Sequence, residues 1–209
     1  MKNTTYIYDI IADKYYETFR GENEFLPKFS VMLPKKAKIL DIGCGVGEDT
    51  KFLIKKNFDV VSVDGSKKML AIARRNVPNH KFHLADMRSK KYRPKSFDGI
   101  VAAFSLIHLT KKESKSLINN FSIWLKENGM LYLALQEGSG EKNVMEPFEP
   151  NERVFINFYE EDEINGVLLS SGFSIIFFRK TNPTTKGEFD NKKIFLIARK
   201  VKKRGKKTK

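Results

Sequence analysis

A glycine-rich segment directly follows the apolar run 37–42 and carries the clearest chemical signal in the chain. Gly43, Gly45 and Gly47 have the spacing G-x-G-x-G, and Glu48 stands where the dinucleotide-binding pattern G-x-G-x-x-G has its third glycine. Glycines let the backbone approach a ligand closely, whereas an acidic neighbour disfavours a pyrophosphate. The segment therefore favours a nucleoside ligand without phosphates; a tight turn that binds nothing is the alternative.

Carboxylates stand at the ends of three successive apolar runs. Asp41, Asp64 and Asp86 end the first, second and third of these runs. Asp64 could accept hydrogen bonds from both hydroxyls of a ribose, and Asp86 could accept one from an exocyclic adenine amine, with the Met87 amide facing a ring nitrogen. A helix-capping role for Asp64 and an exposed turn at Asp86 are the alternatives.

Short apolar runs alternate with helical stretches and would position these residues. Strands are predicted over 37–42, 58–63, 81–85, 97–104 and 130–135. Ser66 is placed to cap the helix after the second run, and Thr110 and Glu113 have capping-box spacing before a helix that Gly129 would stop. The pattern predicts an α/β fold, with a mostly parallel, doubly wound sheet whose carboxyl-end edge gathers the site residues.

The remaining elements lie at the two ends of the chain. Helices are predicted over 4–19 and, with a break at Pro27, up to Leu33. After an irregular polar connection from Gln136 to about residue 152, a helix over 160–171 precedes an antiparallel hairpin of runs 173–178 and 193–198. We therefore expect one domain over 1–198, with a helical lid over 1–34 and a substrate-side insert over 136–159.

The net charge of +14 is concentrated at the end of the chain. Residues 199–209 carry eight Lys or Arg and no acid, which leaves a net charge of +6 over the first 198 residues. Such a tail could bind nucleic acid phosphates, but a solvated, disordered end is the favoured interpretation.

Compositional features favour a cytoplasmic protein that does not span a membrane. The longest apolar run, 99–109, is too short to cross a bilayer, and the first residues lack the apolar stretch of a secretion signal. Cys44 is the single cysteine, so nothing in the sequence implies an internal disulfide or an oxidising compartment.

The sequence resembles the class I S-adenosylmethionine-dependent methyltransferases between about Tyr8 and Phe178. The resemblance lies in ILDIGCGVGEDT, VSVDGS followed by KKML, HLADM, and FDGIVAAFSLIHL. It implies a Rossmann-like sheet of seven strands whose last strand is antiparallel, and it implies S-adenosylmethionine as the cofactor.

The same resemblance assigns roles to single residues. It implies that the three glycines line the methionine part of the cofactor, that Asp64 holds the ribose, and that the Phe104 carbonyl binds the methionine amine. Asp86 and Met87 would contact the adenine. The predicted cofactor-binding residues are Asp41, Gly43, Cys44, Gly45, Gly47, Asp64, Gly65, Asp86, Met87, Phe104 and Tyr15.

The acceptor pocket is expected between the N-terminal helix and the insert. Tyr8 and Tyr15 resemble residues of a lid helix, although core packing would explain them equally well. His108 is the candidate general base because it follows the fourth strand; a polar packing role is the alternative. The predicted substrate-binding residues are Tyr8, His108, Gln136, Arg153, Phe155 and Tyr159.

The motifs that the sequence lacks narrow the range of possible methyl acceptors. The fourth strand is followed by Ala103-Phe104-Ser105-Leu106 in place of the Asn/Asp-Pro-Pro-aromatic run of nucleobase amine methyltransferases, and no cysteine nucleophile stands there. No His, Cys and carboxylate cluster has metal-ligand spacing. We expect in-line methyl transfer to an O, N or S atom of a small molecule.

Three other functions stay open. The first is methylation of RNA or protein with the basic tail as a docking arm, and the second is cofactor binding without catalysis. The third, a nicotinamide dehydrogenase, is disfavoured because its fingerprint would need a third glycine at position 48.

Overall fold

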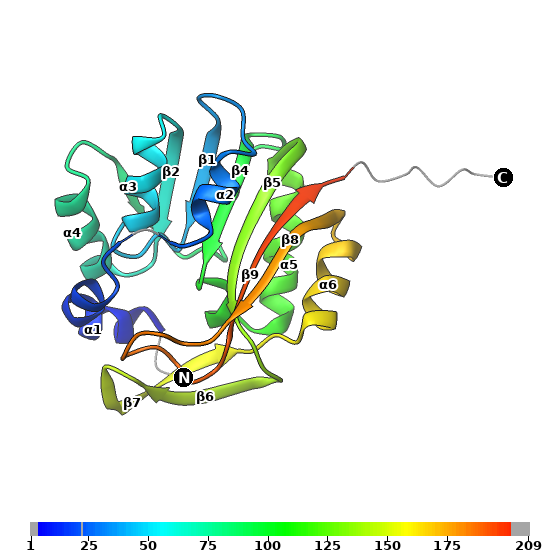
Figure 1. The fold of residues 1–209 in the computed structure, drawn as a ribbon. Helices are drawn as coiled ribbons and strands as arrows, with labels where there is room; N and C mark the ends of the chain where they lie inside the picture. The colour runs from blue at the N-terminus through cyan, green and yellow to red at the C-terminus, as the bar shows by residue number, and fades with distance from the viewer. Residues whose placement is uncertain (1–3, 22, 202–209) are drawn as a thin grey trace.

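Seven strands form one sheet in the order β3-β2-β1-β4-β5-β9-β8 (Figure 1). The computed structural model describes residues 4–21 and 23–201. The strands of this sheet are β1 (Lys38–Ile42), β2 (Asp59–Asp64), β3 (Phe82–Leu84), β4 (Phe97–Ala103), β5 (Leu125–Gln136), β8 (Phe173–Thr181) and β9 (Lys193–Lys200). β9 is antiparallel to both of its neighbours, whereas the pairs among β1 to β5 are parallel. The predicted doubly wound sheet with a terminal antiparallel hairpin is confirmed.

Helices cover both faces of this sheet (Figure 1). They are α1 (Thr4–Thr18), α2 (Leu26–Ser30), α3 (Glu48–Lys55), α4 (Lys67–Asn76), the 3₁₀ helix η1 (Leu106–His108), α5 (Lys111–Trp124) and α6 (Glu161–Ser170). Apolar residues of α2 and α3 pack on one face and those of α5 and α6 on the other. Helices cover both faces because both faces of the sheet are apolar. In β5, Leu131 and Leu133 belong to one core, whereas Met130 and Tyr132 belong to the other.

Local signals located two helix starts correctly. The Ser66 hydroxyl accepts a hydrogen bond from the Met69 backbone N–H at 3.0 Å, which confirms the predicted cap of α4. Thr110 and Glu113 form the predicted capping box at the start of α5. The predicted stop at Gly129 is wrong: α5 ends at Trp124, because Leu125 is already extended and pairs with β4.

The insert is more regular than predicted. Its residues form an antiparallel hairpin of β6 (Glu141–Glu146) and β7 (Glu149–Asn157), a separate two-stranded sheet that lies below the carboxyl ends of β1 and β4 in Figure 1. The prediction of an irregular connection is therefore wrong. β6 is exposed along most of its length, so it lacks the alternating apolar pattern by which strands are recognised.

The last strand extends beyond the predicted end of the domain. β9 continues to Lys200, whose Nζ donates to the Leu125 carbonyl at 2.8 Å and lies 3.5 Å from Glu127. Arg199 and Lys200 thus belong to the sheet, while residues 202–209 of the predicted tail lie outside the described residues. Within the described ranges, no helix has the length and apolar character needed to cross a membrane.

Gly47 is expected to be required for packing as well as for its backbone conformation. It begins α3 with a φ of 82°, and an added Cβ would lie 3.1 Å from Ala73 Cβ and 3.2 Å from the Phe82 ring. Gly140 has a similar φ of 79° with no atom within 4 Å of an added Cβ. Gly140→Ala should lower the free energy of unfolding by about 1 kcal/mol, and Gly47→Ala by about 1 kcal/mol more. Urea denaturation would measure both, and equal losses would show that Ala73 and Phe82 move aside freely.

Candidate functional site

Two adjoining cavities open at the carboxyl-end edge of the sheet, where the strand order reverses between β1 and β4. The first cavity has a volume of about 660 Å³ and reaches toward β2 and β3; the second has about 400 Å³ and reaches toward the β6–β7 hairpin. The residues that line both are Tyr8, Tyr15, Gly43, Gly45, Ala103 and Phe104. Ligands of doubly wound sheets bind at such switch points, so this pair of cavities is the candidate site.

The glycine segment forms the boundary between the cavities. Gly43 has a φ of 77°, and its N–H donates to the Val63 carbonyl at 2.8 Å. A side chain at Gly43 would collide with Ser105, whose hydroxyl donates to the Ile42 carbonyl at 2.8 Å. Ser105 was not predicted as a site residue, and it shows that Gly43 is needed for close packing of the two loops.

Asp64 ties two loops together at the side of the first cavity. One carboxylate oxygen accepts the Gly45 N–H and the other accepts the Ser66 N–H, each at 2.8 Å. Burial raises the pKa of Asp64, and these backbone donors oppose that rise. Each oxygen retains a further acceptor position, so the pair could bind two ligand hydroxyls.

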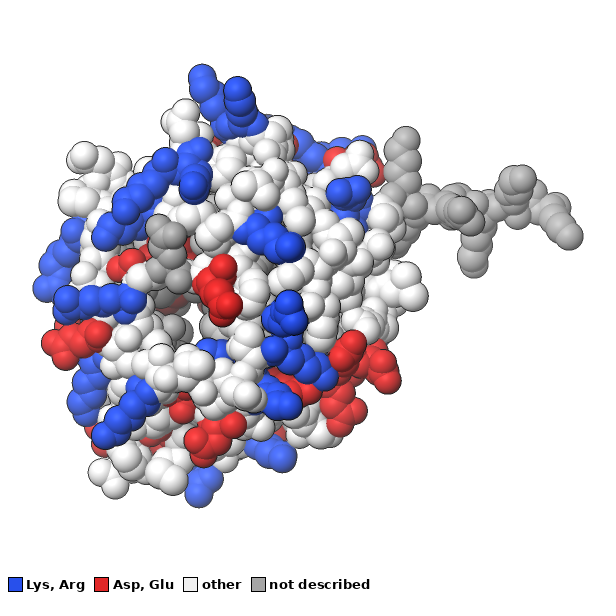
Figure 2. Space-filling view, in the orientation of Figure 1, with Lys and Arg blue, Asp and Glu red and all other residues white. Residues whose placement is uncertain are grey.

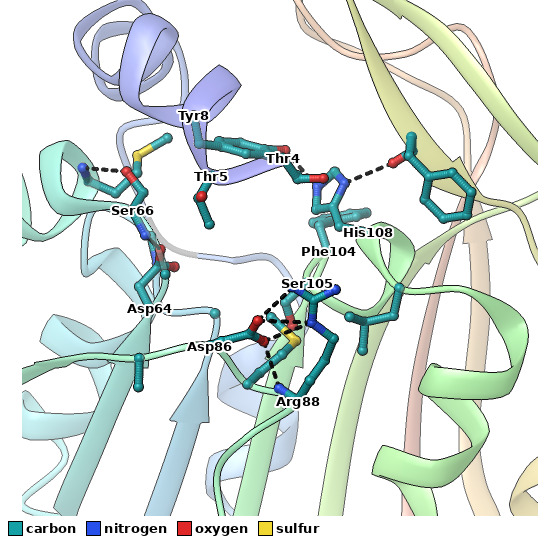
Figure 3. Close-up of a pocket in the computed structure, with 18 of the residues that line it drawn as sticks. Thr4, Thr5, Tyr8, Asp64, Ser66, Asp86, Arg88, Phe104, Ser105 and His108 are labelled. Carbon is teal, nitrogen blue, oxygen red and sulfur yellow. Dashed lines mark hydrogen bonds and ion pairs between the residues drawn. The ribbon is translucent and has the colours of Figure 1, made fainter. Parts of the chain in front are cut away.

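Asp86 is paired with a basic residue that the sequence analysis missed. Arg88 Nη2 lies 2.6 Å from Asp86 Oδ2, and the Arg88 backbone N–H donates to Oδ1 at 2.8 Å. The Arg88 guanidinium holds the pKa of Asp86 below its usual range. Both residues line the first cavity, where Figure 3 shows them below Tyr8, so a ligand amine would share the Asp86 carboxylate with Arg88.

His108 and Tyr8 meet at the top of the first cavity (Figure 3). The Tyr8 hydroxyl lies 2.9 Å from His108 Nε2, and His108 Nδ1 lies 3.1 Å from the Phe155 carbonyl oxygen. A carbonyl oxygen only accepts, so Nδ1 carries the hydrogen and Nε2 accepts from Tyr8. Burial lowers the pKa of His108 to about 4, which leaves the ring neutral at physiological pH.

Comparisons with known proteins agree with this geometry. Residues 39–129 match the family described as methyltransferase domain. Phosphoethanolamine N-methyltransferase 3 of Arabidopsis thaliana is 33% identical over 121 residues, 54% of this chain and 24% of that protein. An uncharacterized methyltransferase of Alkaliphilus oremlandii is 25% identical over 181 residues, 80% of each chain. These comparisons support a class I S-adenosylmethionine-dependent methyltransferase, with residues 39–129 similar to a methyltransferase domain.

The fold of this chain is shared with solved structures. A crystal structure of a SAM-dependent methyltransferase from Methanosarcina mazei superposes with a TM-score of 0.74 at 20% identity, covering 85% of this chain and 98% of that one. This chain spans about a quarter of the length of the phosphoethanolamine N-methyltransferases of A. thaliana and Triticum aestivum that it matches.

Most of the predicted cofactor residues lie at the two cavities. The lining residues are Asp41, Gly43, Cys44, Gly45, Asp64, Gly65, Asp86, Met87, Phe104 and Tyr15. Asp41 accepts a hydrogen bond from Thr50 at 2.6 Å, and burial raises the pKa of its carboxyl to about 8. Gly47 lines neither cavity that the described residues form, because it packs against Ala73 and Phe82.

The predicted substrate residues divide into two groups. Tyr8, His108 and Phe155 line the first cavity, and Gln136 lines the second. Arg153 is exposed on β7 opposite the exposed Met145, donates to the Asn143 carbonyl at 3.0 Å and lines neither cavity of the described residues.

Tyr159 also lies away from both cavities of the described chain. It is buried, and its hydroxyl is hydrogen-bonded to Ser114 at 2.5 Å and to Asn157 at 2.8 Å. These bonds fasten the end of the hairpin to α5, so Tyr159 supports the wall of the site without facing it.

The wall of the second cavity was largely missed by the sequence analysis. Its members come from the end of α1, the turn of the hairpin and the β8–β9 loop, and include Phe19, Glu146, Phe148 and Glu188. The helical spacing of the first segment includes Phe19, but no periodicity or motif marks Glu146, Phe148 or Glu188, which meet α1 only through tertiary contacts.

Protonation of His108 should destabilise the fold. Because its pKa is about 4 when folded and 6.5 in an ordinary environment, the unfolded chain takes up the proton first as the pH falls. The stability that the neutral ring contributes is therefore present above pH 6.5 and is lost as the pH falls through about 4. Urea denaturation should show that His108→Gln is less destabilising near pH 4 than near neutral pH.

His83→Gln is the control for this measurement. Burial and the nearby Lys90 and Lys81 lower the pKa of His83 less than burial lowers that of His108, so its pH dependence should be smaller. If the stability difference between wild type and His108→Gln were independent of pH, the neutral, buried state assigned to His108 would be wrong.

Proposed function

We propose that this methyltransferase transfers the methyl group of S-adenosylmethionine to a small-molecule acceptor. The observation that carries the proposal is the pair of cavities that adjoin at Gly43, Gly45 and Phe104. The first presents carboxylates suited to an adenosine, and the second offers a separate space for another molecule. A donor and an acceptor could therefore lie end to end across the glycine segment.

The residues of the first cavity fit the cofactor. Asp64 would hold the ribose hydroxyls, while Asp86 and the Met87 amide would contact the adenine. Gly43 and Gly45 would lie along the methionine part, and Asp41 near the end of β1 and the Phe104 carbonyl just after β4 are the acceptors expected to hold it. When bound, S-adenosylmethionine supplies an electrophilic methyl carbon on a positively charged sulfur, which the surrounding acids favour.

Alignment is the main contribution that the chain can make to such a reaction. Holding two reactants in line can lower a barrier by up to about 7–11 kcal/mol. The loops that would hold the donor are fixed by the hydrogen bonds of Asp64 and Ser105. Tyr8, hydrogen-bonded to the neutral His108, could pass an acceptor proton to Nε2 where the acceptor requires a base.

The volume of the second cavity and the elements that enclose it favour a small acceptor. The cavity holds about 400 Å³ and is bounded by α1, the β6–β7 hairpin and the loop 182–192. Phosphoethanolamine N-methyltransferase, one of the relatives, is named for a small molecule. A folded protein or duplex RNA would need a more open approach than these three elements leave.

The position at which the basic segment 199–209 begins also favours a small-molecule acceptor. Lys200 contacts Leu125 and Glu127 at the start of β5, at the opposite edge of the sheet from the cavities. In Figure 2, Lys and Arg side chains are scattered over the visible face with Asp and Glu among them. Nucleic acid docking would instead favour a continuous basic surface beside the reacting site.

Asp64→Asn should weaken binding of S-adenosylhomocysteine by about 10- to 100-fold, the effect of losing hydrogen bonds to a charged group. Asp59→Asn is the matched control, since Asp59 lies exposed at the other end of the same strand. Calorimetric titration of the folded variants would measure both affinities. Unaltered affinity in Asp64→Asn would exclude Asp64 as the ribose ligand.

Deleting the residues after Val201 should leave methyl transfer to small acceptors unchanged, because β9 ends at Lys200 and remains intact. The measurement is S-adenosylhomocysteine formed with a panel of small O, N and S nucleophiles and, separately, with total RNA. Turnover on RNA alone, lost on deletion, would replace the small-molecule proposal with tail-assisted RNA methylation.

A further inference from the structure

Among the charged residues that line the second cavity, acids outnumber bases by six to two. Its carboxylates are Glu24, Asp41, Glu48, Asp49, Glu146 and Glu188. The basic residues lining it are Arg20 and Lys193, and each already has a partner. Lys193 lies 2.7 Å from Glu188, and the exposed Arg20 stacks on the Tyr16 ring with 4.7 Å between its Cζ and the ring centroid. The cavity therefore has an excess of negative charge.

Glu146 is the most buried acid that the hairpin contributes to this cavity. Its side chain ends β6 and is 3% exposed, and its Oε1 accepts the Phe148 N–H at 3.3 Å. Within residues 4–21 and 23–201, no Lys or Arg forms an ion pair with it. A buried carboxylate without a cation is costly, and a cationic ligand would offset that cost.

Aromatic rings stand beside this carboxylate. Tyr15, Phe19 and Phe148 are packed edge to face, with ring centroids 4.8 Å apart for Tyr15 and Phe19, 5.7 Å for Phe19 and Phe148, and 6.4 Å for Tyr15 and Phe148. Glu146 acts electrostatically on Tyr15, where it contributes to the raised pKa of the phenol. The faces of aromatic rings attract cations, most strongly where water is excluded.

The charge of Glu146 is separate from the acids that would serve the cofactor. Asp41 and Asp49 belong to β1 and α3, next to the glycine segment, and influence each other electrostatically. Glu146 comes from the hairpin on the far side of the cavity and is absent from the groups that shift the pKa of Asp41. A second positive group, apart from the cofactor's own, would therefore fit beside it.

We propose that the acceptor is an amine that enters the second cavity as an ammonium cation, held by Glu146 and the rings of Tyr15, Phe19 and Phe148. This inference rests on the proposed methyl transfer and narrows its acceptor atom to nitrogen. Carboxylate and phosphate acceptors would meet the same acids unfavourably, and a neutral alcohol would leave Glu146 without a cation.

The chemistry balances with these residues. The ammonium group gives one N–H proton to the Glu146 carboxylate, which leaves a lone pair on nitrogen. That lone pair forms the bond to the methyl carbon as the carbon–sulfur bond breaks, and the bonding electrons go to sulfur, giving neutral S-adenosylhomocysteine. The product is the N-methylated ammonium, and the proton on Glu146 passes to solvent. Burial raises the pKa of Glu146 to about 7, within the range of a proton acceptor at physiological pH.

Binding of tetramethylammonium, which carries no transferable proton, tests the cation site without turnover. In the presence of S-adenosylhomocysteine, calorimetry should show that wild type binds tetramethylammonium and not the similarly shaped, neutral tert-butanol. Glu146→Gln should weaken this binding about tenfold, and Phe148→Leu should weaken it to a lesser degree. Glu149→Gln is the matched control, because Glu149 lies in the same hairpin, outside the second cavity.

A second arm measures S-adenosylhomocysteine formed with amines, alcohols and carboxylates of the same carbon skeleton. Turnover of the amines, reduced in Glu146→Gln while S-adenosylhomocysteine affinity is unchanged, would support the inference. Turnover of only alcohols or carboxylates, or equal tetramethylammonium binding by wild type and Glu146→Gln, would overturn it and leave methyl transfer itself intact. Failure to bind S-adenosylhomocysteine at all would instead refute the proposed function.

Discussion

The two hydrogen bonds of the Asp64 carboxylate hold the site together. They join the glycine segment after β1, through Gly45, to the start of α4 after β2, through Ser66. Parallel pairing aligns these two strands, the N–H groups of Gly43 and Cys44 bond to the Val63 carbonyl just beyond β1, and Asp64 extends this link to Gly45. A carboxylate can accept both backbone donors and still face the first cavity, so the same group shapes the binding loop and remains able to contact a ligand.

The lid helix α1 and the β6–β7 hairpin, which cover the site, are connected by a second set of hydrogen bonds. Tyr8 from α1, His108 from η1 and the Phe155 carbonyl from β7 are hydrogen-bonded in sequence, although they lie far apart in the chain. Each partner is polar and largely enclosed, and an unmade bond there would cost about 1–3 kcal/mol. The lid helix and the hairpin are therefore coupled through the imidazole, and displacement of either one would leave His108 unsatisfied.

The central sheet and the helices that flank it could be predicted from the sequence better than the hairpin and loops that cover the site. Ser66 and Thr110 form caps with residues three positions away, and the strands consist of apolar runs buried on both faces, so these signals are local. β6 has mostly exposed side chains and therefore no such signal. Arg153 lies in the same hairpin, and a basic residue in a segment without an assigned strand gives no indication of which face it occupies. Arg88 and Glu146 become recognisable only through partners brought near by the fold.

The surface of the molecule carries an excess of positive charge, whereas the site below it carries an excess of negative charge. The net charge of +14 lies on surface lysines and arginines, whose fields are screened within about 10 Å at ordinary ionic strength. The carboxylates of Asp64 and Glu146 are enclosed by protein, where screening is weak and an ionised group acts more strongly at short range. A cationic cofactor and an ammonium acceptor would thus approach a weakly repelling surface and then enter an attracting interior. The basic composition of this chain is therefore compatible with a site for cations, because the field at the reacting atoms depends on the nearest buried groups and not on the total charge.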